Sequence, residues 1–335
     1  MIKSIELTNY GPIDRLALDQ LGKINLMIGP NRSGKTILLK ALYCTQRTIE
    51  MTDRGKYNLP IKDTLANKLH WIFQVEKLGN IVRRPESGPL YFKLKESDGS
   101  EFYYSFGTDT ENKIIRAENT CKPRNTNSVF IPAKEVFSLL DIIKSYREIR
   151  MDFGFDETYY DLAIALTPPT QGKIAQALTD VRLKLERAID GKIEYSKEKK
   201  HWQYVQGRQS FDIYSTSEGT KKIAILDTLI ANHFLSRDSV VFIDEPESGL
   251  HPGVLVELLD IVAALAKYGM QFFIASHSYF VIKKLYLLAQ SEKMSIPVIA
   301  FDNAGHNSVS NLLEGMPENS IIDESLKLYE QELCL

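Results

Sequence analysis

Residues 29–36 constrain the fold of this chain more than any other segment. The apolar run Ile24–Ile28 precedes them, and Leu38, Leu39 and Leu42 follow at helical spacing. This order of strand, glycine-containing loop and helix fits the phosphate-binding loop, in which backbone N–H groups at a helix N-terminus surround phosphate oxygens. The residues predicted to bind the phosphates of a nucleotide are Gly29, Pro30, Asn31, Arg32, Ser33, Gly34, Lys35 and Thr36.

Two side chains of this loop have distinct expected roles. Lys35 neutralises the oxygens of the β- and γ-phosphates, and Thr36 binds Mg²⁺ through its hydroxyl. The pattern therefore predicts ATP and Mg²⁺ as cofactors.

A second anchor for chemistry lies at the end of another apolar run, Val240–Ile243, which has no alternation and is typical of a strand buried on both faces. Asp244 and Glu245 follow it directly. Burying two consecutive acids is costly unless a metal ion or hydrogen-bond donors compensate. We expect Asp244 to bind Mg²⁺ and Glu245 to accept a proton from the attacking water.

Two further segments stand in a familiar order after these anchors: Ser248–Pro252, and Ala275–Ser278 at the end of the next predicted strand. With all four, the chain resembles an ATP-binding cassette (ABC) ATPase of the RecF and structural-maintenance-of-chromosomes (SMC) type. The resemblance implies an α/β P-loop ATPase head whose mixed sheet carries an N-terminal antiparallel β part and a helical insertion. It also implies that Ser248–His251 forms the D-loop and that His277 is the switch histidine near the γ-phosphate.

The family signature, which carries serine and glycine before a helix, matches this chain less closely. Ser217 and Gly219 fit, whereas Glu218 and Thr220 depart from the pattern. Ser217 is a good helix N-cap, and the helix end behind it is suited to a phosphate from a second copy of the chain. The alternative is a capped helix with no role in ATP binding.

Gln74 stands where the family places a glutamine that contacts Mg²⁺ and the attacking water. Because only one residue matches, an ordinary glutamine in a strand is almost as good an interpretation. The sequence pattern from about Lys68 onward indicates mostly β structure.

The predicted organisation is a single head over residues 1–335. The expected segments are an N-terminal hairpin and phosphate loop at 1–50, a β-rich lobe at 68–132, a helical insertion at 133–192, the signature region and C-terminal ATPase lobe at 193–305, and a tail at 306–335. Within the lobe, Asp98-Gly99 between Leu90–Lys95 and Glu101–Phe106 predicts a hairpin.

The net charge and the apolar runs restrict the kinds of partner that we expect this chain to bind. The net charge of −2 gives no global reason to bind nucleic acid, and no apolar run is long enough for a membrane helix. Two basic clusters favour solvated loops over nucleic-acid contacts, namely Arg83-Arg84 and Lys197, Lys199 and Lys200. No secretory signal is recognisable, so we expect a cytoplasmic protein.

The length leaves no room for the coiled-coil arms of long SMC proteins. The chain then resembles the short ATPases of overcoming-lysogenization-defect nucleases and of anti-phage systems such as Septu. We expect a head-to-tail dimer that sandwiches ATP and controls a separately encoded effector, a nuclease. The alternatives are a RecF-like repair or replication ATPase that binds DNA, and a nucleotide-gated scaffold without useful turnover.

Overall fold

The computed structural model describes residues 1–334 except 53–59, 86–87, 125, 170–171, 173, 197, 200 and 303. The chain forms two compact units. Unit 1 combines residues 1–125 with 273–335, and unit 2 comprises residues 126–272. The segments predicted from sequence follow chain order, whereas unit 1 brings the N- and C-terminal parts together.

The first sheet of unit 1 is antiparallel, with the strand order β2-β1-β4-β5-β6. Its strands are β1 (Ile2–Tyr10), β2 (Ile13–Leu18), β4 (Leu90–Glu96), β5 (Glu101–Phe106) and β6 (Arg116–Asn119). Both predicted hairpins are confirmed, since Tyr10 pairs with Ile13 and Leu94 pairs with Phe102. Alternate residues of β4 and β5 are buried, as expected for a sheet with one covered face.

The covered face of this sheet meets helix α1 (Lys35–Met51). The hydroxyl groups of Tyr10 and Tyr104 lie 3.1 Å apart and are fully buried. Burial raises the pKa of the Tyr10 hydroxyl, and nearby Tyr104 and Cys44 of α1 add to the rise. The sheet and the helix after the phosphate loop therefore share one core.

Unit 1 also contains a second group of strands, in the order β14-β13-β3-β12. These are β3 (Ile24–Ile28), β12 (Gln271–Ser276, of which residues 273–276 belong to unit 1), β13 (Pro297–Phe301) and β14 (Asn307–Asn311). β3 and β13 run parallel, and β14 runs antiparallel to β13. The other helices of unit 1 are α2 (Ile61–Phe73), α8 (Tyr279–Glu292) and α9 (Ser320–Leu333).

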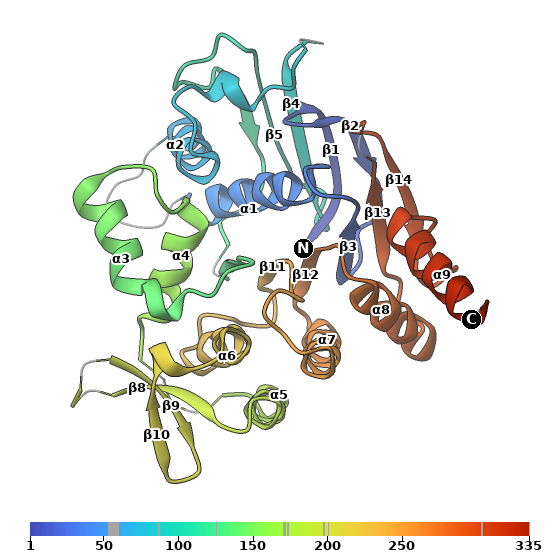
Figure 1. Ribbon diagram of the computed structural model, residues 1–335. Coiled ribbons are helices and arrows are strands. Elements are labelled where there is room, and N and C mark those ends of the chain that lie inside the picture. The colour runs from blue at the N-terminus through green and yellow to red at the C-terminus, as the bar shows by residue number, and fades with distance from the viewer. Residues whose placement is uncertain are drawn as a thin grey trace. The chain divides into compact units, whose positions relative to one another are not determined.

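Two sequence expectations for unit 1 differ from the structure. The segment Lys68–Phe73, expected to be β, is the end of α2, because Leu65, Leu69 and Ile72 bury one helical face. The expected tail after residue 305 contains β14 and α9, and β14 extends the sheet by pairing with β13. Figure 1 shows α9 beside α8 within this unit.

Unit 2 is built around β7 (Ser128–Ile131) and β11 (Val240–Asp244), which pair in parallel. Its helices are α3 (Leu140–Ser145), α4 (Glu157–Leu166), α5 (Gln176–Ala188), α6 (Glu218–Ala231) and α7 (Pro252–Tyr268). Figure 1 shows α5, α6 and α7 side by side. The helical insertion predicted from sequence is confirmed in α3, α4 and α5.

A separate three-stranded sheet completes unit 2, with the order β10-β9-β8. Its strands are β8 (Lys192–Ser196), β9 (His201–Gln206) and β10 (Gln209–Asp212). Trp202 of β9 packs edge-on against Phe137 and Tyr195, with ring centroids 4.9 and 5.6 Å away. Trp202 therefore packs against other aromatic side chains of unit 2.

Short single-turn helices connect the larger elements at residues 78–81, 137–139 and 213–215, and a π-helical turn covers 146–150. Among the described residues, no helix has both the length and the apolar character needed to cross a bilayer.

Candidate nucleotide site

The phosphate loop of unit 1 has a defined backbone conformation between β3 and α1. Gly29 and Gly34 have φ angles of 144° and 111°, and α1 begins immediately after, at Lys35. The Lys35 Nζ donates hydrogen bonds of 2.7 Å to the carbonyl oxygens of both Gly29 and Pro30. The predicted strand, loop and helix are thus confirmed, with the lysine folded over its own loop.

Both glycines are required by close approach as well as by conformation. A Cβ on Gly29 would lie 2.5 Å from the carbonyl oxygen of Phe301, and one on Gly34 would lie 2.8 Å from Cγ1 of Ile13. Positive φ adds strain for any other residue. The loop is therefore held between β13 and the start of β2.

The N-terminus of α1 is suited to an anion. No side chain caps it, and its first turn carries no acidic residue. The hydroxyl of Ser33 is buried and has no hydrogen-bond partner in the part of the chain that the structure describes. A buried polar group without a partner is costly, and a phosphate oxygen would satisfy it.

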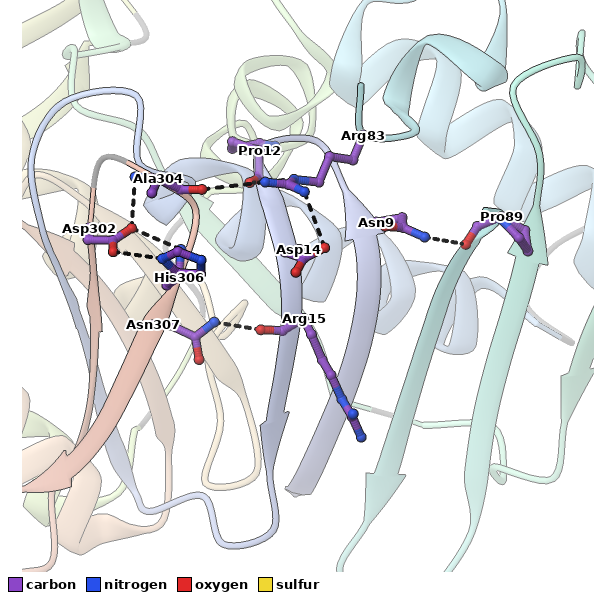
Figure 2. A network of polar contacts seen from close by, with 10 residues as sticks. All are labelled: Asn9, Pro12, Asp14, Arg15, Arg83, Pro89, Asp302, Ala304, His306 and Asn307. Carbon is purple, nitrogen blue, oxygen red and sulfur yellow. Dashed lines mark hydrogen bonds and ion pairs between the residues drawn. The ribbon is translucent and has the colours of Figure 1, made fainter. Parts of the chain in front are cut away.

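Arg83 braces the region beside this loop (Figure 2). Its guanidinium donates to the carbonyl oxygens of Pro12 and Ala304, at 3.3 and 3.4 Å, and pairs with Asp14 at 3.2 Å. For Arg83 the sequence expectation of a solvated loop charge is wrong, because two other segments of unit 1, at residues 12–14 and at Ala304, share its guanidinium. Arg84 and Lys199 are exposed, whereas Lys197 and Lys200 lie outside the described residues.

The turn after β13 is also ordered by its own side chains. One Asp302 carboxylate oxygen accepts from the backbone N–H groups of Ala304 and His306, and the other lies 3.1 Å from Nδ1 of His306. The Asn307 amide donates to the carbonyl of Arg15, as Figure 2 shows. A cavity of about 440 Å³ opens here beside Pro30 of the phosphate loop. No sequence motif marked this turn.

Gln74 and His277 belong to the same unit as the phosphate loop. Gln74 follows α2 in a left-handed conformation, with φ of 51°, and is a helix C-cap rather than a strand residue. Its amide nitrogen is buried and makes no hydrogen bond within the described residues. His277 comes directly after β12 and is exposed. The roles of both residues stay predictions.

The two acids of unit 2 lie at the end of β11. Asp244 is the last residue of the strand and is 9% exposed. Glu245 turns the chain with φ of 47°, and its carbonyl oxygen accepts a 3.0 Å hydrogen bond from the Ser248 N–H. The predicted strand end is confirmed, and the catalytic and metal-binding roles stay predictions.

Ser217 caps α6 in the same unit. Its hydroxyl accepts from the Thr220 N–H at 3.1 Å, so the predicted N-cap is confirmed. A Cβ on Gly219 would lie 2.6 Å from the carbonyl oxygen of Gly249. The beginning of α6 therefore rests on the turn Ser248–His251, a contact that requires glycine at position 219.

Lys222, which sequence reasoning passed over, lies at the start of the second turn of α6 and is 4% exposed. Its Nζ donates to the carbonyl oxygens of Glu245 and, at 3.3 Å, Ala133. Burial lowers the pKa of Lys222 to about 8, and the carboxylates of Glu247, Asp244, Glu245 and Glu218 oppose that shift. The sequence indicated only that Lys222 follows the helix cap Ser217 by five residues, and this spacing does not predict the contact with Glu245.

No cluster of three or more histidine, cysteine, aspartate or glutamate side chains that would hold a metal ion occurs within the described ranges. Mg²⁺ in phosphate-loop proteins needs few protein ligands because nucleotide phosphates and water supply the rest. The Thr36 hydroxyl and the Asp244 carboxylate are each a donor type that this ion prefers, and the role of each as a ligand stays a prediction.

Known protein families include one that matches most of this chain. A family model described as "AAA domain, putative AbiEii toxin, Type IV TA system" matches residues 24–283. A search of curated proteins finds no match.

Several solved structures share the fold. An SMC head bound to the C-terminal winged-helix domain of ScpA has a TM-score of 0.53 at 12% identity, covering 92% of this chain and 97% of that one. The SMC head with an extended coiled coil bound to the ScpA C-terminal domain, derived from Pyrococcus furiosus, has a TM-score of 0.52 at 10% identity, with 98% of each chain covered. The head domain from Thermotoga maritima gives 0.49 at 12% identity, over 92% and 98%. The two matches with TM-scores above 0.5 confirm the predicted fold of an SMC-type ATPase head.

Proposed function

Because this chain belongs to the family described as "AAA domain, putative AbiEii toxin, Type IV TA system", we propose that it is a Mg²⁺-dependent ATPase that acts as a dimer. The observation that carries the proposal is the loop 29–36, where an uncapped helix N-terminus and the buried, unpartnered Ser33 hydroxyl fit a phosphate group.

The predicted site residues have distinct roles in the proposed hydrolysis of ATP. Lys35 leaves its carbonyl partners to neutralise the β- and γ-phosphates, and Thr36, Asp244 and Gln74 hold Mg²⁺. The ion, when bound, neutralises charge that develops on the transferred phosphoryl group. Glu245 accepts a proton from the attacking water, and His277 contacts the γ-phosphate.

The dimer places the beginning of α6 of one copy against the nucleotide of the other. The 14-residue helix directs the partial positive charge of its N-terminus toward Ser217, which favours an incoming phosphate. The exposed Thr220 and Ser217 hydroxyl groups lie 2.8 Å apart at this helix end and are suitable donors.

Self-association with nucleotide tests the dimer. We expect the chain with Mg²⁺ and a non-hydrolysable ATP analogue to sediment as a dimer, and Ser217→Arg to remain a monomer because the long arginine side chain keeps the α6 N-terminus away from the partner copy. Ser310→Arg, on exposed strand β14, is the matched control and should dimerise normally. Equal dimerisation of both variants would remove α6 from the interface.

Nucleotide binding itself is tested at Lys35. Lys35→Ala should weaken equilibrium binding of ATP by at least about tenfold, since a charge-assisted contact to phosphate is lost. Unchanged ATP affinity in a folded Lys35→Ala protein would contradict the assigned loop.

The biological role we propose is anti-phage defence in the cytoplasm, with ATP state controlling a separately encoded nuclease. The family description, which names a toxin–antitoxin system, supports a defence role. The SMC heads bound to ScpA illustrate that a head of this fold can hold a second protein. Nuclease activity of the neighbouring gene product, switched by this chain and ATP, is the expected result. Neighbouring replication genes and salt-dependent DNA binding would support the RecF-like alternative instead.

A further inference from the structure

The ammonium group of Lys222 bridges the ends of two adjacent strands of unit 2. One of its acceptors is the carbonyl oxygen of Glu245, directly after β11, and the other is that of Ala133, shortly after β7. These strands pair in parallel from Val240 and Ser128 onward. The buried Lys222 side chain of α6 therefore holds the ends of both strands, next to Asp244 and Glu245.

The Glu245 carbonyl is an unusual anchoring point. Its residue has φ of 47°, a conformation that costs free energy for a residue with a side chain. The same oxygen accepts from Ser248 N–H, which begins the turn against Gly219. Lys222 thus holds the Glu245 peptide in place. This peptide sets the direction of the Glu245 side chain and begins the turn that contacts the N-terminus of α6.

Lys221 provides an internal comparison. It is buried to a similar extent on the same helical turn, but its Nζ donates to Ser138 at 2.7 Å and lies 3.4 Å from the Glu135 carboxylate. It therefore anchors α6 to the segment after β7 without touching Glu245. Substituting Lys221 therefore tests the anchoring of helix α6, and substituting Lys222 tests the anchoring of the Glu245 peptide.

We propose that Lys222 is a positioning residue that holds the Glu245 peptide in its left-handed conformation and so transmits movement of the Ser217 helix to the general base. This inference rests on the proposed ATPase function. When a nucleotide engages the α6 N-terminus, any displacement of the helix reaches Glu245 through one hydrogen bond to its carbonyl oxygen.

The test compares Lys222→Met with Lys221→Met and with Lys222→Arg in the full chain. Two readouts are measured: steady-state ATP turnover, and hydrogen–deuterium exchange of the peptide covering residues 244–251, without nucleotide. Lys222→Met should lower kcat by about tenfold or more with ATP KM within about twofold, because orientation rather than binding is lost. Exchange in 244–251 should rise in Lys222→Met only, and Lys222→Arg should restore part of both readouts.

The outcomes are distinguishable. Unchanged exchange in 244–251, or native kcat in folded Lys222→Met, overturns the positioning role whatever the fate of the ATPase proposal. An equal loss in Lys221→Met also overturns it, because the effect would then belong to helix anchoring. If the wild-type chain does not hydrolyse ATP, the proposed function fails and the effect of Lys222 on turnover fails with it. Increased exchange in Lys222→Met would still establish that Lys222 holds the Glu245 peptide.

Discussion

The three cysteines differ sharply in their surroundings at the residue scale. Cys44 and Cys121 are buried, whereas Cys334 at the end of α9 is exposed. Burial raises the pKa of the Cys121 thiol to about 11, so little reactive thiolate forms at neutral pH. A disulfide exchange reagent applied to the native chain should modify one thiol per chain quickly, and Cys334→Ser should remove that phase. Two or more fast thiols would contradict the packing around Cys44 and Cys121.

Gly29 is a residue where backbone conformation and space act together. With φ of 144° and the Phe301 carbonyl 2.5 Å from any added Cβ, Gly29→Ala must move the phosphate loop or β13. We expect ATP binding to fall by more than tenfold. Gly99→Ala, at a hairpin tip where a Cβ meets no atom within 4 Å, is the control for an alanine at positive φ and should bind ATP normally. Native ATP affinity in Gly29→Ala would show that the loop tolerates the displacement.

At the scale of elements, an ion pair between helices joins α5 to α6. Arg182 contacts Asp227 through two hydrogen bonds of 2.6 and 3.1 Å, and Asp227 is nearly buried. Asp227→Ala removes both hydrogen bonds and leaves the Arg182 guanidinium with the Glu186 carboxylate at 3.5 Å, so it should lower the free energy of unfolding by about 1–3 kcal/mol in urea titration. Glu324→Ala, in the exposed Glu324–Lys327 pair, should leave the midpoint unchanged. Equal midpoints for both variants would show that the α5–α6 pair contributes nothing.

Elements marked by local patterns are the ones that the sequence predicts well. The hairpin at Asp98-Gly99, the apolar run before Asp244 and the Ser217 cap need only neighbouring residues to be recognised. The helical end of α2 was misread because Trp71, Ile72 and Phe73 favour strands, whereas its buried helical face decides the structure. Arg83 was misassigned to a solvated loop and Lys222 was missed, because their partners lie far along the chain. Ala304 is 221 residues from Arg83, and Ala133 is 89 residues from Lys222.

For the whole molecule, we propose that ATP turnover and dimer formation both depend on Asp244 and Glu245 at the end of β11. Glu245→Gln keeps the shape of the side chain but removes its capacity to accept a proton. ATP binding should persist, and hydrolysis should fall by a factor of about 10²–10⁴. The ATP-bound dimer should accumulate because the hydrolysis that precedes its dissociation is blocked. Asp244 is unchanged in this variant, so we expect Mg²⁺ binding to persist.

The role of Glu245 is tested by measuring phosphate release from the purified wild-type chain and from Glu245→Gln in saturating Mg²⁺ and ATP. We expect turnover by the wild type, loss of turnover in Glu245→Gln, and a stable ATP-bound dimer of the variant in sedimentation. Hydrolysis at the same rate by both chains would contradict the assignment of Glu245 as the general base.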